Sequence, residues 1–359
     1  MPDELRLGTR GSQLALWQAN TVAARIHATG GPPCRIVVIK TTGDRLQEAP
    51  LSEIGGKRLF VKEIEDALLR RDIDLAVHSS KDMPAVLPEG LAIAGVLPRE
   101  DPRDAIVLPV MANGLGPMAD SPDAHLPSAL SHQPSAISHP SAISHPSAMT
   151  TVDDLVAVLG QSPSIGTGSV RRIAQLARLF PGAHFAPIRG NLDTRLRKLD
   201  AGAHHALVLA AAGLRRLGFA HRISLALPAA ACVPAPGQGI VAIEIREDDE
   251  LVRRTVARID DPSAAAALSA ERALVETLGG GCQTPVGALA SPLDGERLEL
   301  VAVVVALDGS RAVHGHAVGA RDQAAALGAQ VGAQLLNDGA GEILAEASRA
   351  QGAVEGIQP

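Results

Sequence analysis

The sequence predicts an α/β fold in which mostly parallel sheets are covered by helices, followed by a small α+β region. Short segments rich in β-branched residues alternate with amphipathic helical segments over most of the chain. At about 150 residues per domain, the 359 residues predict two or three domains. The composition, 46% hydrophobic and 20% charged, excludes a disordered chain, a collagen-like repeat and a coiled coil.

The first hundred residues contain three predicted strands and two predicted helices. Residues 5–7 form the first strand, and Ser12 caps a helix with Leu14, Trp17 and Ala24 on one side. The remaining elements are a strand at 35–40, a helix at 62–71 and a buried strand at 73–77 that ends at His78 and Ser79.

A second α/β block begins near Asp104 and is interrupted by an insertion at about 113–150. Residues 127–149 repeat Pro-Ser-Ala-Leu/Ile-Ser-His three times, a unit that is too short and too polar to bury a face. Its histidines (His132, His139 and His145) have no accompanying Cys or carboxylate, which favours a flexible insertion over a metal site. The α/β pattern resumes with strands at 164–165, 206–210 and 240–245.

The last hundred residues predict a small third unit. Asp261 and Pro262 are typical of the start of a helix, and Leu268, Leu274, Val275 and Leu278 give that helix an apolar side. Strands near 286–290 and 298–307, a turn at 308–309, a third strand and terminal helices follow.

Composition and charge restrict the classes of function. No segment has the ~20 consecutive apolar residues of a membrane span, the acidic N-terminus does not match a secretory signal, and three scattered Cys imply no disulfide framework. We therefore expect a soluble, reduced, cytoplasmic protein without a membrane partner. Residues 165–222 carry ten Arg or Lys against two acids, a local charge of +8 in a chain of net charge -6. This segment is either a solvated surface or an anion-binding cleft, and the scarcity of aromatics argues against a nucleic-acid partner.

Adjacent arginines at a predicted helix start are the most informative feature. Ser169 would cap a helix with Val170, Ile173, Leu176, Ala177 and Phe180 inward, which places Arg171 and Arg172 in the first turn. Positive charges at this end of a helix interact unfavourably with the helix dipole. The two arginines therefore either bind an anion or form an exposed pair that remains in place despite this unfavourable interaction. Similar strand-to-helix turns occur at 9–12 and 188–191. Three such turns at the carboxyl ends of strands predict a site for a polyanionic ligand.

Two further residues have side chains that could act in catalysis or in covalent attachment. Asp82 follows a strand and Lys81, and Met83 before Pro84 keeps this loop extended; the carboxylate either stabilises positive charge or only shapes the turn. Cys282 follows three glycines, a context that suits an attachment point or nucleophile. Cys34 and Cys232, in contrast, have the apolar surroundings of buried structural cysteines.

Together these segments resemble the porphobilinogen deaminase (hydroxymethylbilane synthase) family over nearly the whole chain outside the insertion. The matching segments are 9–18, 55–63, 78–84, 99–105, 166–172, 189–191, 236–239 and 271–285. The resemblance implies two periplasmic-binding-protein-like lobes, residues 1–102 with 238–258 and residues 103–237, plus a third domain at 259–359. It implies a transferase that joins four porphobilinogens, with loss of ammonia, into linear hydroxymethylbilane for tetrapyrrole biosynthesis.

The resemblance also implies roles for individual residues. Asp82 would be catalytic, and Cys282 would carry a dipyrromethane cofactor through a thioether. The other residues implied to bind the cofactor are Lys81, Ser79, Thr167, Ser169, Arg171 and Arg172, and those implied to bind substrate are Arg10, Ser12, Gln18, Arg189, Arg195 and Arg216. Lys57 and Phe60 would belong to a lid, and no metal is implied. A monomer that passes its product to uroporphyrinogen-III synthase is expected.

One residue of the anion-binding turn departs from the family pattern. Gly168 stands where the family usually has a second Ser, which removes one hydroxyl donor but keeps both arginines. The main alternative to the enzyme is a two-lobed binding protein for a small polyanion, which would not explain Cys282 in its glycine-rich loop. A nucleic-acid-binding protein is the weaker alternative.

Overall fold

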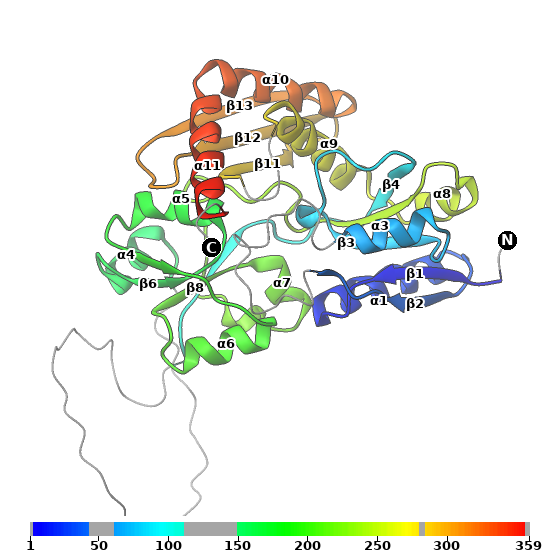
Figure 1. The fold of residues 1–359 in the computed structure, drawn as a ribbon, viewed down its shortest axis with the longest axis horizontal. Coiled ribbons are helices and arrows are strands. Elements are labelled where there is room, and N and C mark those ends of the chain that lie inside the picture. The colour runs from blue at the N-terminus through cyan, green and yellow to red at the C-terminus, as the bar shows by residue number, and fades with distance from the viewer. Residues whose placement is uncertain (1–2, 43–60, 111–148, 280–283, 356–359) are drawn as a thin grey trace, which may run out of the picture.

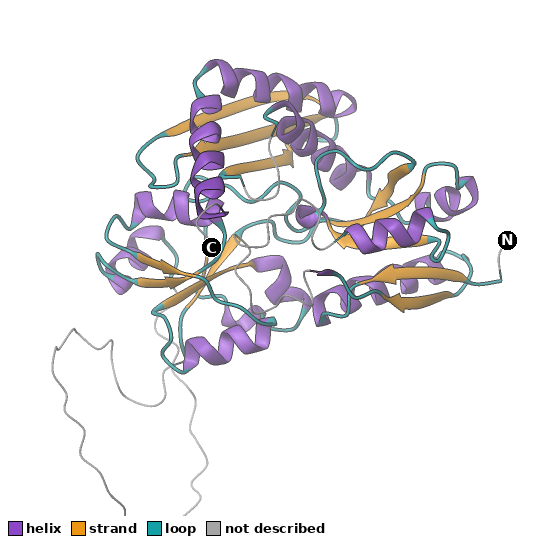
Figure 2. Ribbon diagram, in the orientation of Figure 1, coloured by secondary structure: helices purple, strands orange, loops and turns teal. Residues whose placement is uncertain are grey.

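The computed structural model describes residues 3–42, 61–110, 149–279 and 284–355 of the chain. Three sheets, each accompanied by helices, make up this part of the molecule (Figures 1 and 2). The third sheet and its helices lie above the other two in the view of Figure 1. Two mostly parallel sheets and one small α+β unit confirm the fold class predicted from the sequence.

The first sheet has the strand order β2-β1-β3-β10-β4. Its strands are β1 (Leu5–Thr9), β2 (Cys34–Val38), β3 (Leu75–Ser79), β4 (Leu91–Val96) and β10 (Val241–Arg246). Its helices are α1 (Gln13–Ala28), α3 (Lys62–Leu69) and α8 (Glu250–Ala257). Strands β1, β2 and β3 are parallel, whereas β10 arrives from a distant part of the chain and pairs antiparallel with β3 and β4.

Helix α1 begins where the sequence predicts, but it buries a different face. The Ser12 hydroxyl accepts a hydrogen bond from the Ala15 backbone N–H at 3.3 Å. The buried side chains are Ala15, Gln18, Ala19, Val22 and Ile26, so the side that carries Leu14, Trp17 and Ala24 is not the one that faces the core. Trp17 instead stacks under the guanidinium of Arg216, 5.5 Å from the ring centroid. Arg216 lies almost two hundred residues from Trp17 in the sequence, so the local hydrophobic pattern could not predict this contact.

The second sheet has the order β7-β6-β8-β5-β9, with β5 antiparallel to its neighbours. Its strands are β5 (Asp104–Val107), β6 (Ser164–Gly166), β7 (His184–Ala186), β8 (Ala206–Ala210) and β9 (Leu225–Ala226). Its helices are α4 (Val152–Leu159), α5 (Val170–Leu179), α6 (Leu192–Asp200) and α7 (Ala211–Arg216). The apolar core between sheet and helices includes Ile106, Leu176, Phe180 and Val208.

The third sheet is an antiparallel meander, β11 (Val286–Pro292), β12 (Arg297–Val305) and β13 (Ala312–Ala320). It packs against α9 (Pro262–Thr277), α10 (Ala324–Asn337) and α11 (Ala340–Glu355). Helix α9 begins as predicted, because the Asp261 carboxylate accepts from the Ala264 N–H at 2.8 Å and Pro262 occupies the first turn.

Two connections join the first sheet to the second and run side by side. Residues 97–103 lead from β4 to β5, and residues 227–240 lead from β9 back to β10. The Glu100 N–H donates to the Gly239 carbonyl at 3.0 Å, and the Gln238 amide donates to the Pro102 carbonyl at 2.7 Å. The domain boundaries expected at 102 and 237 fall within these connections, and the division into domains stays a prediction.

Among the described residues, no helix is long and apolar enough to cross a membrane. The expected lid residues Lys57 and Phe60, the repeat histidines and Cys282 lie outside the described residues.

Gly239 is required by the contact between the two connections. Its φ is +88°, and a Cβ at this position would collide with the Glu100 carbonyl oxygen. We expect Gly239→Ala to destabilise the protein by about 2 kcal/mol or more, because backbone strain and overlap add. The matched control is Gly218→Ala, where φ is +80° but nothing lies within 4 Å of a Cβ; it should cost about 1 kcal/mol. Equal shifts of the urea midpoint in the two variants would contradict this prediction.

Candidate active site

Two cavities lie where the carboxyl ends of strands from the first two sheets face each other. The larger has a volume of about 610 Å³ and is lined by residues after β3, β6 and β7, by the 235–238 connection and by α9. The smaller, of about 70 Å³, is lined by the start of α1 and the end of β3. Asp82 lines both cavities. The anionic site predicted at strand ends therefore corresponds to a cavity shared by two sheets and a helix of the third unit.

Asp82 is presented by a single short turn after β3. The turn, Ser80–Asp82, follows Ser79, and Met83 adopts the extended conformation expected before a proline. The Ser80 N–H donates to the Ile240 carbonyl at 3.0 Å, and Met83 is buried. Gly237 lies so close to this turn that a Cβ would overlap Ser80 Oγ. The turn is thus held against the 227–240 connection, and Lys81 and Asp82 line the cavity.

Lys81 contributes a cation whose protonation is less favourable than usual. Burial lowers the pKa of its ammonium to about 8, with Arg171 and Arg172 acting in the same direction and the Asp82 and Asp104 carboxylates acting against it. Its Nζ lies 3.4 Å from the Gln238 amide oxygen. Near neutral pH the group remains mostly protonated, so it adds positive charge to the cavity.

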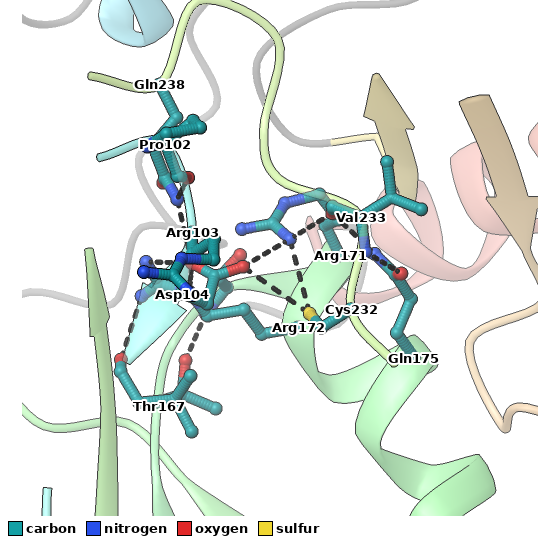
Figure 3. A network of polar contacts seen from close by, with 12 residues as sticks. Pro102, Arg103, Asp104, Thr167, Arg171, Arg172, Gln175, Cys232, Val233 and Gln238 are labelled. Carbon is teal, nitrogen blue, oxygen red and sulfur yellow. Dashed lines mark hydrogen bonds and ion pairs between the residues drawn. The ribbon is translucent and has the colours of Figure 1, made fainter. Parts of the chain in front are cut away.

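Arg171 and Arg172 are buried and share one carboxylate, that of Asp104 (Figure 3). Arg171 Nη1 lies 2.7 Å from Asp104 Oδ2, and Arg172 Nε lies 2.9 Å from Oδ1. Burial alone would raise the pKa of Asp104, but the two guanidinium groups outweigh it and hold the pKa well below its usual range. The alternative of an exposed arginine pair is wrong.

The face that α5 buries matches the sequence expectation only in part: Leu176 and Phe180 are buried as expected, but the other expected residues are not fully buried. Arg171, Arg172, Ala174, Gln175 and Leu176 are the buried positions, whereas Val170, Ile173 and Ala177 are only partly buried. The reason is that α5 is covered on two sides: Ala174 packs with Val303 and Val305 of the third sheet. Ser169 occupies the N-cap position, but its side chain makes no capping hydrogen bond.

Asp104 and Gln238 are the members of this network that sequence reasoning did not select. The Gln238 amide donates to Asp104 Oδ1 at 3.0 Å and to the Pro102 carbonyl, and Arg171 also donates to the Val233 carbonyl at 2.6 Å (Figure 3). The sequence did contain a signal for Asp104, which begins an otherwise apolar strand. A carboxylate that is buried in such a strand needs a charged or hydrogen-bonding partner. The sequence could not identify that partner, which lies 67 residues away.

A second pair of arginines lines the larger cavity from the turn before α6. Arg189 and Arg195 both face it, and Arg195 Nε donates to the Gly190 carbonyl at 2.8 Å. Burial lowers the pKa of Arg195, and the nearby cations Arg172 and Arg189 lower it further. Like charges gathered in this way favour an anionic occupant.

The remaining predicted residues lie in three places. Arg10, Ser12, Gln18 and Ser79 line the smaller cavity, where the Gln18 amide donates to Ser79 Oγ at 2.9 Å. Thr167 is buried behind the turn, and its Oγ1 accepts from the Ser169 N–H at 3.3 Å. Arg216 is not among the residues of either cavity; it donates to the Gly239 carbonyl at 2.6 Å and stacks on Trp17.

The departure at Gly168 leaves room in the cavity wall. The glycine lines the larger cavity, and a Cβ there would meet only the Pro187 Cβ at 3.8 Å. A serine would therefore fit at this position without any change of the backbone. No group of three or more His, Cys, Asp or Glu side chains that could hold a metal occurs in the described part of the chain.

Comparison with known proteins agrees with this geometry. Residues 5–254 match the family model of the porphobilinogen deaminase dipyromethane cofactor binding domain, and residues 265–337 match that of the porphobilinogen deaminase C-terminal domain. The chain belongs to the porphobilinogen deaminase family. The resemblance seen in the sequence is confirmed.

Curated relatives match nearly the whole length of the chain. The porphobilinogen deaminase of Syntrophobacter fumaroxidans is 42% identical, with 96% of this chain and 98% of that protein covered. The porphobilinogen deaminase of Desulforudis audaxviator is 44% identical with the same coverage. Among solved structures, the periplasmic aliphatic sulphonate binding protein of Escherichia coli is 12% identical with a TM-score of 0.35, covering 77% of this chain and 71% of that one.

As a member of this family, the protein joins porphobilinogen molecules into hydroxymethylbilane in tetrapyrrole biosynthesis and uses a dipyrromethane cofactor. The larger cavity fits that cofactor. Its volume lies within the ~300–1,000 Å³ of small-molecule sites, and arginines surround it as the acetates and propionates of pyrroles require. Arg171 Nε and Ser80 Oγ are buried without a partner among the described residues, so each has hydrogen-bonding capacity for a ligand.

Asp104 should matter for stability in a pH-dependent way. Because its pKa is lowered in the folded protein, its contribution is present above the unfolded pKa of ~4 and is lost as pH falls below that value. We expect Asp104→Ala to cost about 3–5 kcal/mol near pH 7, since two buried arginines lose their counter-ion. The difference from the parent protein should shrink as the pH falls from about 5 to about 1, measured as urea midpoints. Asp72→Asn, at an exposed pair with Arg70, is the control and should change little. A pH-independent difference for Asp104→Ala would contradict the assignment.

Proposed function

We propose that Asp82 is the catalytic carboxylate of the polymerisation and that Cys282 carries the dipyrromethane covalently. The observation that supports the first part is the position of Asp82, the only carboxylate among the described residues that line the larger cavity. It lies opposite the arginines of the second sheet and also borders the smaller cavity. The other described charged side chains that line this cavity are a lysine and arginines. The carboxylate of Asp82 therefore serves a different role from these cations.

The chemistry of porphobilinogen explains what a fixed carboxylate contributes. Loss of ammonia breaks the aminomethyl C–N bond and leaves an electron-poor azafulvene, in which positive charge develops on the pyrrole nitrogen. A carboxylate held in place near that nitrogen stabilises the charge without reorganising during the reaction. When bound, the dipyrromethane supplies the pyrrole carbon to which the first substrate is joined.

The cations of the site bind the carboxylates of the pyrroles. Each pyrrole unit carries an acetate and a propionate, so a growing chain becomes strongly anionic. We assign Arg171, Arg172, Lys81 and Ser169 to the cofactor, with Thr167 supporting the turn, and Arg189 and Arg195 to substrate. Asp104 keeps the first two guanidinium groups in fixed positions, which lowers the entropy lost on binding.

The smaller cavity adds polar groups beside Asp82. We assign Arg10, Ser12 and Gln18 to substrate and Ser79 to the cofactor, since Ser79 is bonded to Gln18 and adjoins the turn that carries Asp82. The substrate role of Arg216 stays a prediction, because its contacts are with Trp17 and Gly239.

The remaining proposals concern regions and partners. We propose that Lys57 and Phe60 belong to a lid and that the chain forms three domains, 1–102 with 238–258, 103–237 and 259–359. We further propose that the protein acts as a cytoplasmic monomer whose product is consumed by uroporphyrinogen-III synthase, since linear hydroxymethylbilane must be cyclised to become a macrocycle.

Asp82→Asn removes the negative charge with almost no change of shape. We expect the variant to retain the cofactor mass but to lose turnover by at least ~100-fold, because the developing charge loses its counter-ion. Hydroxymethylbilane formation is measured alongside intact mass. Asp248→Asn, an exposed carboxylate paired with Arg71, is the control and should keep parental activity. Near-normal turnover of Asp82→Asn would exclude a catalytic role.

Intact mass tests the covalent attachment. We expect the purified protein to exceed its sequence mass by two linked pyrrole units, and Cys282→Ser to lack the excess even after incubation with porphobilinogen. The controls are Cys34→Ser and Cys232→Ser, which should keep it: burial raises the pKa of Cys34 to about 11 and that of Cys232 to about 12, so neither is a ready thiolate. Loss of the adduct in either control, or its persistence in Cys282→Ser, would overturn the assignment.

A further inference from the structure

We propose that His78, paired with Glu244, accepts the proton that Asp82 takes up at each condensation and returns it to solvent. This inference rests on the proposed role of Asp82. Because His78 acts through Asp82 and does not touch the reacting atoms, it is a positioning residue rather than a catalytic residue.

His78 and Glu244 form a buried pair across the first sheet. His78 lies on β3 opposite Ala242, and Glu244 lies on β10 opposite Ala76, so both side chains share one face of the sheet. His78 Nε2 and Glu244 Oε2 are 3.1 Å apart, with His78 5% exposed and Glu244 fully buried. Glu244 Oε1 has no hydrogen-bond partner among the described residues. A buried carboxylate requires a compensating positive charge, which a protonated imidazole supplies.

His78 is also among the residues that line the smaller cavity, as Asp82 is. Glu244 occupies Nε2, so Nδ1 is the nitrogen that remains for exchange with the cavity. The volume of about 70 Å³ exceeds the ~10–15 Å³ that one water molecule needs. A water in this cavity can hydrogen-bond both to Asp82 and to Nδ1 of His78, and it provides a route for a proton.

The proton balance of the reaction requires a proton acceptor at each condensation. The aminomethyl nitrogen leaves from its protonated, ammonium form: the C–N bond breaks with its electron pair going to nitrogen, and neutral ammonia departs. A new C–C bond then forms at a pyrrole carbon, which loses its hydrogen as a proton. If Asp82 kept that proton, it would lack the negative charge needed for the next condensation. Transfer through water to His78 Nδ1 restores the Asp82 carboxylate, Glu244 stabilises the imidazolium, and the proton then passes to solvent.

The elements packed around His78 also carry other charged groups. Arg10 and Asp82 line the same cavity, and α3, which packs on β3, contributes the buried Glu65. Arg246, two residues beyond Glu244 on β10, is engaged by the carbonyls of Leu68 and Ile73 and by Asp249.

The experiment compares His78→Gln and Glu244→Gln in the full, cofactor-loaded protein, from about pH 5.5 to pH 9. Glutamine at position 78 preserves a donor toward Glu244 but cannot titrate. We expect His78→Gln to lose about 100-fold in kcat with KM within about twofold, and to lose the acidic limb of the kcat profile. In Glu244→Gln that limb should move to lower pH, because the charge that stabilises the imidazolium is gone. His314→Gln, at an exposed position on β13, is the control and should match the parent.

The outcomes separate this inference from the proposed function. Turnover by Asp82→Asn would defeat the proposed function itself. An inactive Asp82→Asn together with a His78→Gln variant of parental kcat and pH profile would overturn the proton route alone. The cofactor mass and the melting temperature show whether each variant folds. If His78→Gln fails to load the cofactor, the pH profile of kcat for Glu244→Gln tests the proposal instead. An acidic limb that is unchanged in Glu244→Gln would overturn it.

Discussion

The Asp104 carboxylate, buried between Arg171 and Arg172, is the interaction on which the rest of the site depends. Without it, two guanidinium groups would be buried at the start of a helix, where the helix dipole already disfavours positive charge. With it, each arginine keeps further donors, one of which, Arg171 Nε, has no partner within the described residues. The same carboxylate accepts from Gln238, so the arginines are fixed relative to the connection between the sheets.

That connection also ties the third unit to the first two. Glu271 of α9 pairs with Arg99 at 2.6 Å and accepts from the backbone N–H groups of Gly237 and Ala290 at 2.6 and 2.7 Å. One buried carboxylate therefore joins both connections, helix α9 and strand β11. The 227–240 connection, helix α9 and strand β11 all contribute walls of the larger cavity, and two buried acids, Asp104 and Glu271, set their relative positions.

Local signals were sufficient for most elements and for the candidate residues. Asp261 with Pro262 begins a helix because a cap and a fixed φ act within one turn, and Ser12 does the same for α1. Local signals failed for the buried face of α1 and for part of the buried face of α5. Trp17 is turned toward Arg216, and Arg171 and Arg172 are buried because Asp104 neutralises them. Each of these partners is more than sixty residues away, beyond any periodicity in the sequence.

The sequence by itself determined the fold class, the family and a set of residues with the right chemistry. Its segments at 78–84, 166–172 and 271–285 contain the residue types that the reaction needs, namely a carboxylate, clustered cations and a cysteine in a glycine-rich loop. Only the tertiary structure decided which groups meet: Asp82 at the border of two cavities, Asp104 between two arginines, and His78 against Glu244. The physical reason is that burial and charge compensation depend on distances through space, which strand order and chain crossings establish.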